Sequence, residues 1–164
     1  MPFLVSDTSV IIDLDRGDFL EPALGLSDRF VVPDLLFVHE LNADFGRRLL
    51  ALGLEVVSLE GAEVAKATTL RRAEARLSVA DTFAYALALG RRWTLLTGDG
   101  VLRAVAEADG VVVHGVLWVI DRLESEGVCD YPTLHAGLSK AAQHPRCRLP
   151  KREIDARLRR YAGG

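Results

Sequence analysis

Short apolar runs alternate with longer amphipathic segments along the first 128 residues of the chain. Five runs have the length of a buried strand, at residues 3–6, 29–32, 54–58, 93–97 and 111–114. The segments between them carry apolar residues at helical spacing, which predicts helices at residues 10–14, 35–52, 62–77, 79–87, 101–108 and 116–126. This alternation is typical of a three-layer α/β/α fold, in which helices cover both faces of a five-stranded parallel sheet.

Beyond Val128 the pattern becomes purely helical. Helices are expected near residues 133–143 and 151–161, and the second one places Ile154, Leu158 and Tyr161 on one face. The chain has no low-complexity linker and no internal repeat. We therefore predict an α/β domain at residues 1–128 and a helical C-terminal extension at residues 129–164 that packs on it.

Length and composition indicate a soluble globular protein. The chain has 164 residues, of which 49% are hydrophobic and 26% charged, and no apolar run is long enough to span a bilayer. The start Met1-Pro2-Phe3 lacks the basic flank of a signal peptide, and Cys129 and Cys147 do not form a disulfide framework. A reducing, cytoplasmic location without membrane contact is expected.

Charge is spread unevenly along the chain. The net charge is −3, but the residues from Arg146 onward hold seven basic and two acidic side chains. A basic tail on an acidic body suggests contact with an anionic partner such as nucleic acid. The alternative is that these arginines only solvate a terminal helix.

Two aspartates directly follow strands of the predicted sheet. Asp7 ends the first strand, and Asp99 lies in a Gly98-Asp99-Gly100 turn after the fourth. The carboxyl ends of parallel strands meet at one edge of the sheet, where binding sites are commonly built. Each residue also has an ordinary alternative, because Asp7 could be a helix cap and Asp99 a turn residue.

Two further acids lie on helices expected beside this edge. Asp81 falls in the first turn of an otherwise apolar helix, and Glu40 lies in the middle of the predicted helix 35–52. A capping box that begins at Ser78 is the alternative for Asp81. For Glu40 the alternative is a surface glutamate paired to a neighbouring arginine.

The four carboxylates together suggest a metal site. Acids close to one another repel and raise one another's pKa unless a cation lies between them. Oxygen ligands without Cys or His select Mg²⁺ or Mn²⁺. One or two such ions activate water and stabilise the leaving oxygen in phosphodiester hydrolysis. We therefore assign Asp7, Glu40, Asp81 and Asp99 as candidate metal ligands and catalytic residues.

The order and flanks of these acids resemble the PIN-domain family of metal-dependent ribonucleases. The matching motifs are Val5-Ser-Asp7-Thr-Ser, His39-Glu40-Leu41, Ala80-Asp81 and Leu96-Thr-Gly-Asp99, within about residues 1–128. The resemblance implies a PIN-like fold, Mg²⁺ or Mn²⁺ as cofactor, and internal cleavage of single-stranded RNA. It also implies that Ser9 and Thr97 orient the acids.

Many small members of this family are VapC-like toxins of toxin–antitoxin pairs. The resemblance therefore implies a homodimer that a small antitoxin protein inhibits. Two departures bear on this reading. Gly100 follows Asp99 where many members have another polar or acidic residue, which weakens the hold on a second metal. The helical extension suggests a separate branch, for which a PIN-fold binding or RNA-processing protein without a toxin role is the alternative.

Arginines near the predicted site are candidates for binding substrate phosphates, although arginines at helix ends are often simply solvated. The candidates are Arg71, Arg72, Arg76, Arg91, Arg92 and Arg103.

Other readings of the sequence fit less well. A receiver domain needs an Asp after the third strand and a Lys after the fifth, where the chain has Ser58 and His114. A haloacid-dehalogenase phosphatase needs a second acid two residues after Asp7, and a dinucleotide site needs a third glycine. A zinc site is a further alternative, but its ligands match no common finger spacing: Cys129, His135, His144 and Cys147.

Overall fold

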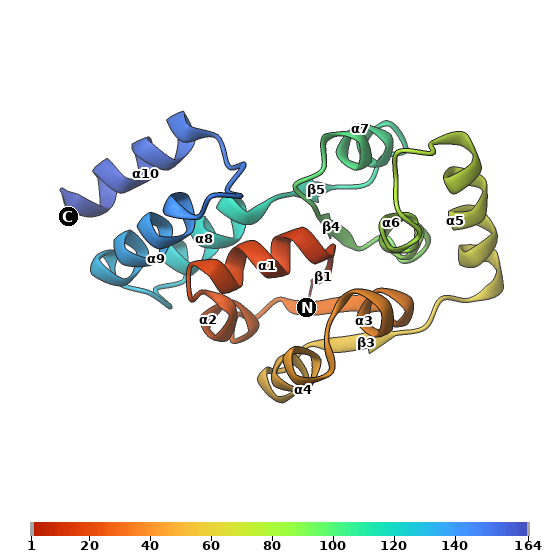
Figure 1. Ribbon diagram of the computed structural model, residues 1–164, viewed down its shortest axis with the longest axis horizontal. Helices are drawn as coiled ribbons and strands as arrows, with labels where there is room; N and C mark the ends of the chain where they lie inside the picture. Colours follow the sequence, from red (N-terminus) through yellow and green to blue (C-terminus); the bar gives the residue numbers. More distant parts are fainter. Residues whose placement is uncertain (1, 164) are drawn as a thin grey trace.

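Five parallel strands form one sheet in the computed structural model, which describes residues 2–163 (Figure 1). The strands are β1 (Phe3–Ser6), β2 (Arg29–Pro33), β3 (Glu55–Val57), β4 (Thr94–Leu96) and β5 (Val113–His114), and their order in the sheet is β3-β2-β1-β4-β5. The register pairs Val5 of β1 with Val31 of β2 on one side and with Leu95 of β4 on the other. All three side chains are fully buried, as expected for a parallel sheet covered on both faces.

Ten helices surround the sheet within the described residues. They are α1 (Thr8–Arg16), α2 (Leu20–Leu24), α3 (Asp34–Glu40), α4 (Ala43–Leu52), α5 (Gly61–Ala73), α6 (Val79–Arg91), α7 (Gly100–Ala108), α8 (Val116–Ser125), α9 (Tyr131–Gln143) and α10 (Lys151–Ala162). The α/β class and the five-stranded parallel sheet predicted from the sequence are confirmed. None of the helices in residues 2–163 combines the length and apolar character needed to cross a bilayer.

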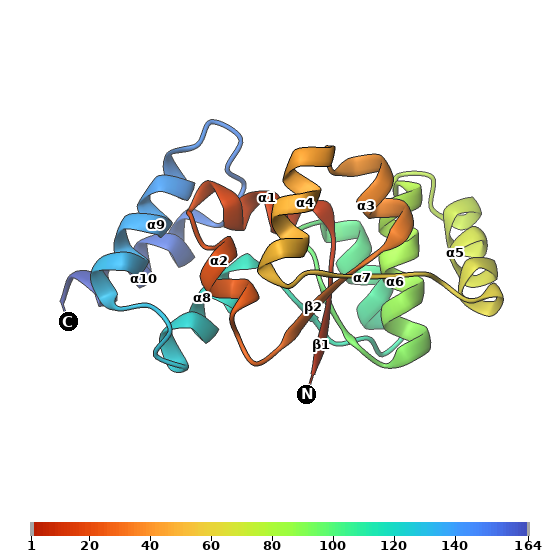
Figure 2. The same ribbon diagram turned by 90° about the horizontal axis from the view of Figure 1, so that it is seen from below.

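Two hydrophobic clusters, one on each face of the sheet, hold the helices in place. On one face, α5, α6 and α7 pack over Val5, Val31 and Leu95. On the other face, α1, α2 and α8 pack over Leu4, Phe30 and Leu96, and α9 and α10 extend this cluster outward. Figure 2 shows the two groups of helices at opposite ends of the molecule, with the sheet between them.

The predicted helix 35–52 is wrong, because the chain forms two helices there. Leu41 leaves α3 with an extended backbone, and the side chain of Asn42 caps α4 by accepting a hydrogen bond from the Phe45 backbone N at 2.8 Å. Asparagine is among the strongest N-cap residues, and the bend buries Leu41. Glu40 is therefore the last residue of α3, and its predicted position in the middle of a helix is wrong.

Two smaller differences between the predicted and the observed helices concern α2 and the end of α5. The short helix α2 was not predicted, since its five residues are too few to show a helical period. Helix α5 ends at Ala73, four residues earlier than expected, because Glu74 leaves the helical backbone. The apolar face predicted for the last helix is confirmed, since Ile154 and Tyr161 are buried and Leu158 packs beside them.

Helix α9 lies very close to the end of α1. A Cβ atom placed on Gly137 would come within 2.6 Å of the Gly17 carbonyl oxygen and 2.4 Å of the Phe19 ring. A side chain larger than a hydrogen atom does not fit there without displacing backbone. Gly137 therefore permits the contact that attaches the C-terminal helices to the sheet.

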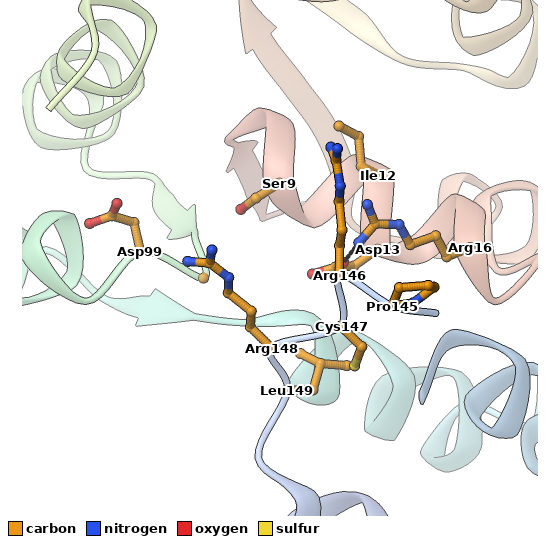
Figure 3. A pocket seen from close by; sticks show the side chains of 11 residues that line it. Ser9, Ile12, Asp13, Arg16, Asp99, Pro145, Arg146, Cys147, Arg148 and Leu149 are labelled. Atoms are coloured by element: carbon orange, nitrogen blue, oxygen red, sulfur yellow. Dashed lines mark hydrogen bonds and ion pairs between the residues drawn. The ribbon is translucent and has the colours of Figure 1, made fainter. Parts of the chain in front are cut away.

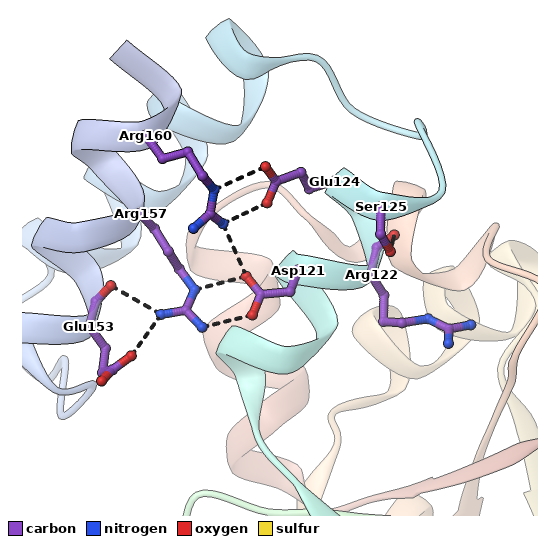
Figure 4. Close-up of polar contacts among 7 residues, drawn as sticks. All are labelled: Asp121, Arg122, Glu124, Ser125, Glu153, Arg157 and Arg160. Carbon is purple, nitrogen blue, oxygen red and sulfur yellow. Dashed lines mark hydrogen bonds and ion pairs between the residues drawn. The ribbon is translucent and has the colours of Figure 1, made fainter. Parts of the chain in front are cut away.

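Ion pairs attach α10 to α8, as Figure 4 shows. The Arg157 guanidinium binds both carboxylate oxygens of Asp121, at 2.8 and 2.7 Å. One helical turn further on, Arg160 binds both oxygens of Glu124, at 3.1 and 2.6 Å. Bidentate pairs of this kind fix orientation as well as distance. They hold the last helix of the chain in a defined position.

Candidate functional site

Asp7 lies at the centre of the carboxyl edge of the sheet. It follows β1 and is the N-cap of α1, and its side chain is only 2% exposed. One carboxylate oxygen accepts hydrogen bonds from the Val10 backbone N and the Ser9 hydroxyl, both at 2.9 Å. The other oxygen accepts a hydrogen bond from the Thr97 hydroxyl at 2.5 Å. Neutral donors alone thus hold this buried carboxylate.

Thr97 connects Asp7 to Asp99. Its oxygen also accepts a hydrogen bond from the Asp99 backbone N at 3.0 Å. Asp99 is in turn the N-cap of α7, where its carboxylate accepts from the Leu102 N at 2.9 Å. Because β1 and β4 are neighbours in the sheet, α1 and α7 begin side by side. The two aspartates therefore lie at adjacent helix N-termini, which favour negative charge.

Asp81 and Glu40 approach the same edge from two other helices. Asp81 forms a capping box with Ser78 at the start of α6, and its charge acts on Asp7. Glu40, exposed at the end of α3, accepts a hydrogen bond from the hydroxyl of Thr8, the residue after Asp7. The other three acids predicted from the sequence are thus each linked to the neighbourhood of Asp7, Asp99 through Thr97, Glu40 through Thr8 and Asp81 through its charge. The capping interactions considered for Asp7 and Asp81 are present as well, and Asp99, considered as a turn residue, is also a helix cap.

Burial raises the pKa of the Asp7 carboxyl above its ordinary value of 3.8. The hydrogen bonds from Thr97, Val10 and Ser9 lower this pKa and only partly offset the effect, while the nearby charge of Asp81 raises it further. A cation close to Asp7 would favour its ionised form.

The four acids also share a lack of cationic partners. Most other acidic side chains of the chain form ion pairs, but Asp7, Glu40, Asp81 and Asp99 form none within residues 2–163. In the same range, no three His, Cys, Asp or Glu side chains lie close enough to form a ready-made metal site. The donors still fit a hard divalent ion in their chemistry, since they are carboxylate oxygens that form no ion pair with an arginine or lysine of the described residues.

The arginines predicted to bind substrate have different surroundings. Arg71 and Arg72 are exposed at the end of α5. The bound Glu74 carboxylate and, more weakly, the charge of Asp99 raise the pKa of Arg76. Arg103 binds Glu107 at 3.1 Å and lies near the Val113 carbonyl. Arg76 therefore lies within electrostatic reach of Asp99.

The other two candidate arginines lie at the end of α6. Arg91 binds both carboxylate oxygens of Glu63 at 3.1 Å and thereby ties α6 to α5. Arg92 is exposed, with a left-handed backbone that ends the helix. Arg91 therefore has a structural role in joining two helices.

A pocket of about 730 Å³ opens beside Asp99 (Figure 3). One wall is α1, with Ser9, Asp13 and Arg16, and the other wall is the link between α9 and α10. This link brings Arg146 and Arg148 to the carboxyl edge. Sequence reasoning did not identify them as site residues, because their place there depends on how α9 and α10 pack. In the sequence, only the excess of basic residues after position 145 pointed to Arg146 and Arg148 as site residues.

The family model DUF3368, described as a PIN domain, matches residues 3–162 and thus crosses the predicted boundary after residue 128. Among solved structures, the chain is similar to a PilT N-terminus domain protein from the hyperthermophilic archaeon Sulfolobus solfataricus P2. The identity is 17% and the TM-score 0.47, over 74% of this chain and 94% of the other. No curated protein matches the sequence.

Proposed function

The chain belongs to the PIN-domain family, whose model matches residues 3–162, and we propose that it is a metal-dependent endoribonuclease that hydrolyses phosphodiester bonds of single-stranded RNA. The observation that carries the proposal is the buried Asp7 carboxylate, which is bonded to Thr97 and has no cationic partner within residues 2–163. A buried acid without a counter-ion is costly, and such groups occur at functional sites.

Asp7, Glu40, Asp81 and Asp99 would hold Mg²⁺ or Mn²⁺ in this reaction. When bound, such an ion activates a water molecule and stabilises the leaving oxygen of the phosphodiester. The remaining tasks belong to the chain. Ser9 and Thr97 fix the orientation of the Asp7 carboxylate through their hydroxyl groups. The Leu102 backbone N does the same for Asp99.

Replacement of Asp99 by Asn tests this role against a matched control. Asp130 is also a helix N-cap, accepting from the Thr133 N at 2.9 Å, and lies at the start of α9. Asn caps helices as well as Asp does, so both variants keep their helices. We expect Asp99→Asn to lower Mg²⁺- or Mn²⁺-dependent cleavage of a labelled single-stranded RNA by about 100-fold or more. Asp130→Asn should cleave at the original rate.

Two results would contradict the proposal. One is equal cleavage by the Asp99→Asn and Asp130→Asn proteins. The other is a flat calorimetric titration of the unaltered protein with Mg²⁺ and with Mn²⁺, together with no cleavage of any single-stranded RNA tested.

We also propose that the protein is a homodimer and the toxin of a toxin–antitoxin pair, which rests on the resemblance described from the sequence. Induced expression should then arrest growth, and co-expression of a small protein from the neighbouring reading frame should relieve the arrest. A protein that cleaves RNA in vitro but does not slow growth would favour an RNA-processing role. Light scattering at several concentrations would measure the oligomeric state.

A further inference from the structure

The link between α9 and α10 begins with a turn at residues 145 and 146, after which half-buried and exposed side chains alternate along residues 146–149. Cys147 and Leu149 pack against the hydrophobic cluster, whereas Arg146 and Arg148 are exposed. The half-buried side chains of Cys147 and Leu149 thus anchor the link and leave the guanidinium groups of Arg146 and Arg148 exposed. Figure 3 shows the side chain of Arg148 extending toward Asp99 and that of Arg146 extending alongside Ile12 of α1.

Contacts at both ends fix the position of the link. The Cys147 backbone N donates to the His144 carbonyl at 3.0 Å, and the Arg146 backbone N donates to the His144 ring at 3.1 Å. Beyond the link, the pairs of Arg157 with Asp121 and Arg160 with Glu124 attach α10 to α8. A defined backbone allows the two guanidinium groups to bind a ligand without first ordering the chain.

Charge in the pocket is not balanced. On the α1 wall, Arg16 is bound to Asp13 at 3.2 Å, so their charges offset one another. Within residues 2–163, the guanidinium groups of Arg146 and Arg148 form no ion pair, and the only other acid lining the pocket is Asp99. The pocket thus combines one acidic edge with two uncommitted cationic groups.

We propose that Arg146 and Arg148 bind phosphate groups of the RNA strand that is cut at the acidic edge. This inference rests on the function proposed above and adds the residues that position its substrate. Guanidinium groups bind phosphate oxygens with two parallel hydrogen bonds, so a pair of them on a fixed link fits a phosphodiester backbone. A volume of about 730 Å³ lies within the usual range of ligand pockets.

A binding measurement without cleavage tests this proposal. The Asp99→Asn protein provides the background, so that the RNA stays intact, and fluorescence anisotropy of a labelled single-stranded oligonucleotide with Mg²⁺ reports affinity. In that background we compare Arg146→Gln/Arg148→Gln with Arg152→Gln/Arg159→Gln, which removes two exposed arginines from α10. Both double variants lose the same charge.

We expect the Arg146→Gln/Arg148→Gln protein to bind RNA about 10-fold to 100-fold more weakly, and the control to change by less than about 3-fold. The slope of log affinity against log salt concentration should become shallower by about 1.4, since each phosphate contact to a single strand contributes about 0.7 and two contacts are lost. In the active protein, Arg148→Gln should raise KM and leave kcat nearly unchanged.

Equal weakening in the two double variants would overturn the proposal, because it would show only a general charge effect. Unchanged RNA affinity would also overturn it and would favour an acidic protein partner for this surface. Faster cleavage by Arg148→Gln would overturn it too, because the arginine would then be an inhibitor. Each of these outcomes is distinguishable from a failure of the proposed function, which would show as no cleavage of RNA by the unaltered protein.

Discussion

Two groups of acidic side chains in this protein differ in their partners, because one group is paired with arginines and the other is bound by neutral donors. On α8, Asp121 and Glu124 each bind an arginine of α10 through two hydrogen bonds. At the carboxyl edge, the described partners of the Asp7 carboxylate are two hydroxyl groups and a backbone N. The first group joins two helices, whereas the second leaves its negative charge for a cation from outside the chain. The comparison separates acids that stabilise the fold from acids available for chemistry.

The pKa directions agree with this division. Hydrogen bonds from Arg160 hold the pKa of Glu124 below its ordinary value of 4.5. Burial holds the pKa of Asp7 above its ordinary value of 3.8. Folding thus favours the ionised form of Glu124 and the protonated form of Asp7. Only the second residue would gain further from a bound metal ion.

The largest expected effect is on activity, from Asp7→Asn. Asparagine keeps the N-cap of α1 but removes the charge, so cleavage should fall by about 100-fold or more. Because the folded protein disfavours the Asp7 charge, the unfolding midpoint in urea at pH 7 should stay the same or rise. Cleavage assays and urea unfolding monitored by circular dichroism measure the two effects. A variant that loses stability and activity together would contradict the division.

The opposite behaviour is expected from Asp121→Asn. Arg157, whose side chain is 15% exposed, would lose its charged partner on α8 and one of its two hydrogen bonds there, because the Asn amide nitrogen cannot accept, and would keep its ion pair with Glu153. We expect the free energy of unfolding to fall by about 1 kcal/mol, after allowance for solvent screening of these partly exposed groups. Urea unfolding at low and at high salt measures the loss.

A double-mutant cycle isolates this contribution. If Arg157 and Asp121 act as a pair, the losses in free energy of unfolding caused by Arg157→Gln and by Asp121→Asn should not add in the double variant, because each change removes the same interaction. Additive losses would show that the two residues act independently. The metal affinity measured by calorimetry should not change in either variant, since Asp121 does not line the acidic edge.

The sequence predicts the strands and the edge acids well, because both depend on short-range patterns. Continuous apolar runs mark buried parallel strands, and an Asp directly after such a run marks the edge where strands end. Asp7 and Asp99 lie together since β1 and β4 are neighbours. The break at Leu41 and Asn42 was missed because the apolar stripe continues through it, and only the Asn42 cap reveals the second helix.

Contacts between distant helices were beyond the reach of the sequence. Asp121 and Arg157 are 36 residues apart, and so are Glu124 and Arg160. The two acids are three residues apart on α8 and the two arginines are three residues apart on α10, so both contacts lie on facing sides of these helices. Nothing in the charge pattern distinguishes these arginines from Arg146 and Arg148. The packing of α9 against Gly17 and Phe19 determines which arginines reach an acid and which reach the pocket.

The smallest expected effect is a difference in the pH dependence of stability. The contribution of Glu124 to the free energy of unfolding is present above the pKa that Glu124 has in the unfolded chain. It is lost as pH falls through the lower pKa of the folded protein. Glu124→Gln should therefore destabilise the protein at pH 6 more than at pH 3. The contribution of Asp7 has the opposite sign, since protons bind more tightly to the folded state: it is present below pH 3.8 and is lost as pH rises through the folded value.

The stability of Asp7→Asn relative to the unaltered protein should consequently rise as pH rises from 3 to 6. Urea unfolding of both variants and the unaltered protein between pH 3 and pH 6 would show two difference curves with slopes of opposite sign. Slopes of the same sign would mean that Asp7, like Glu124, is stabilised as a carboxylate by the folded chain alone. The edge would then have no electrostatic need for a metal ion.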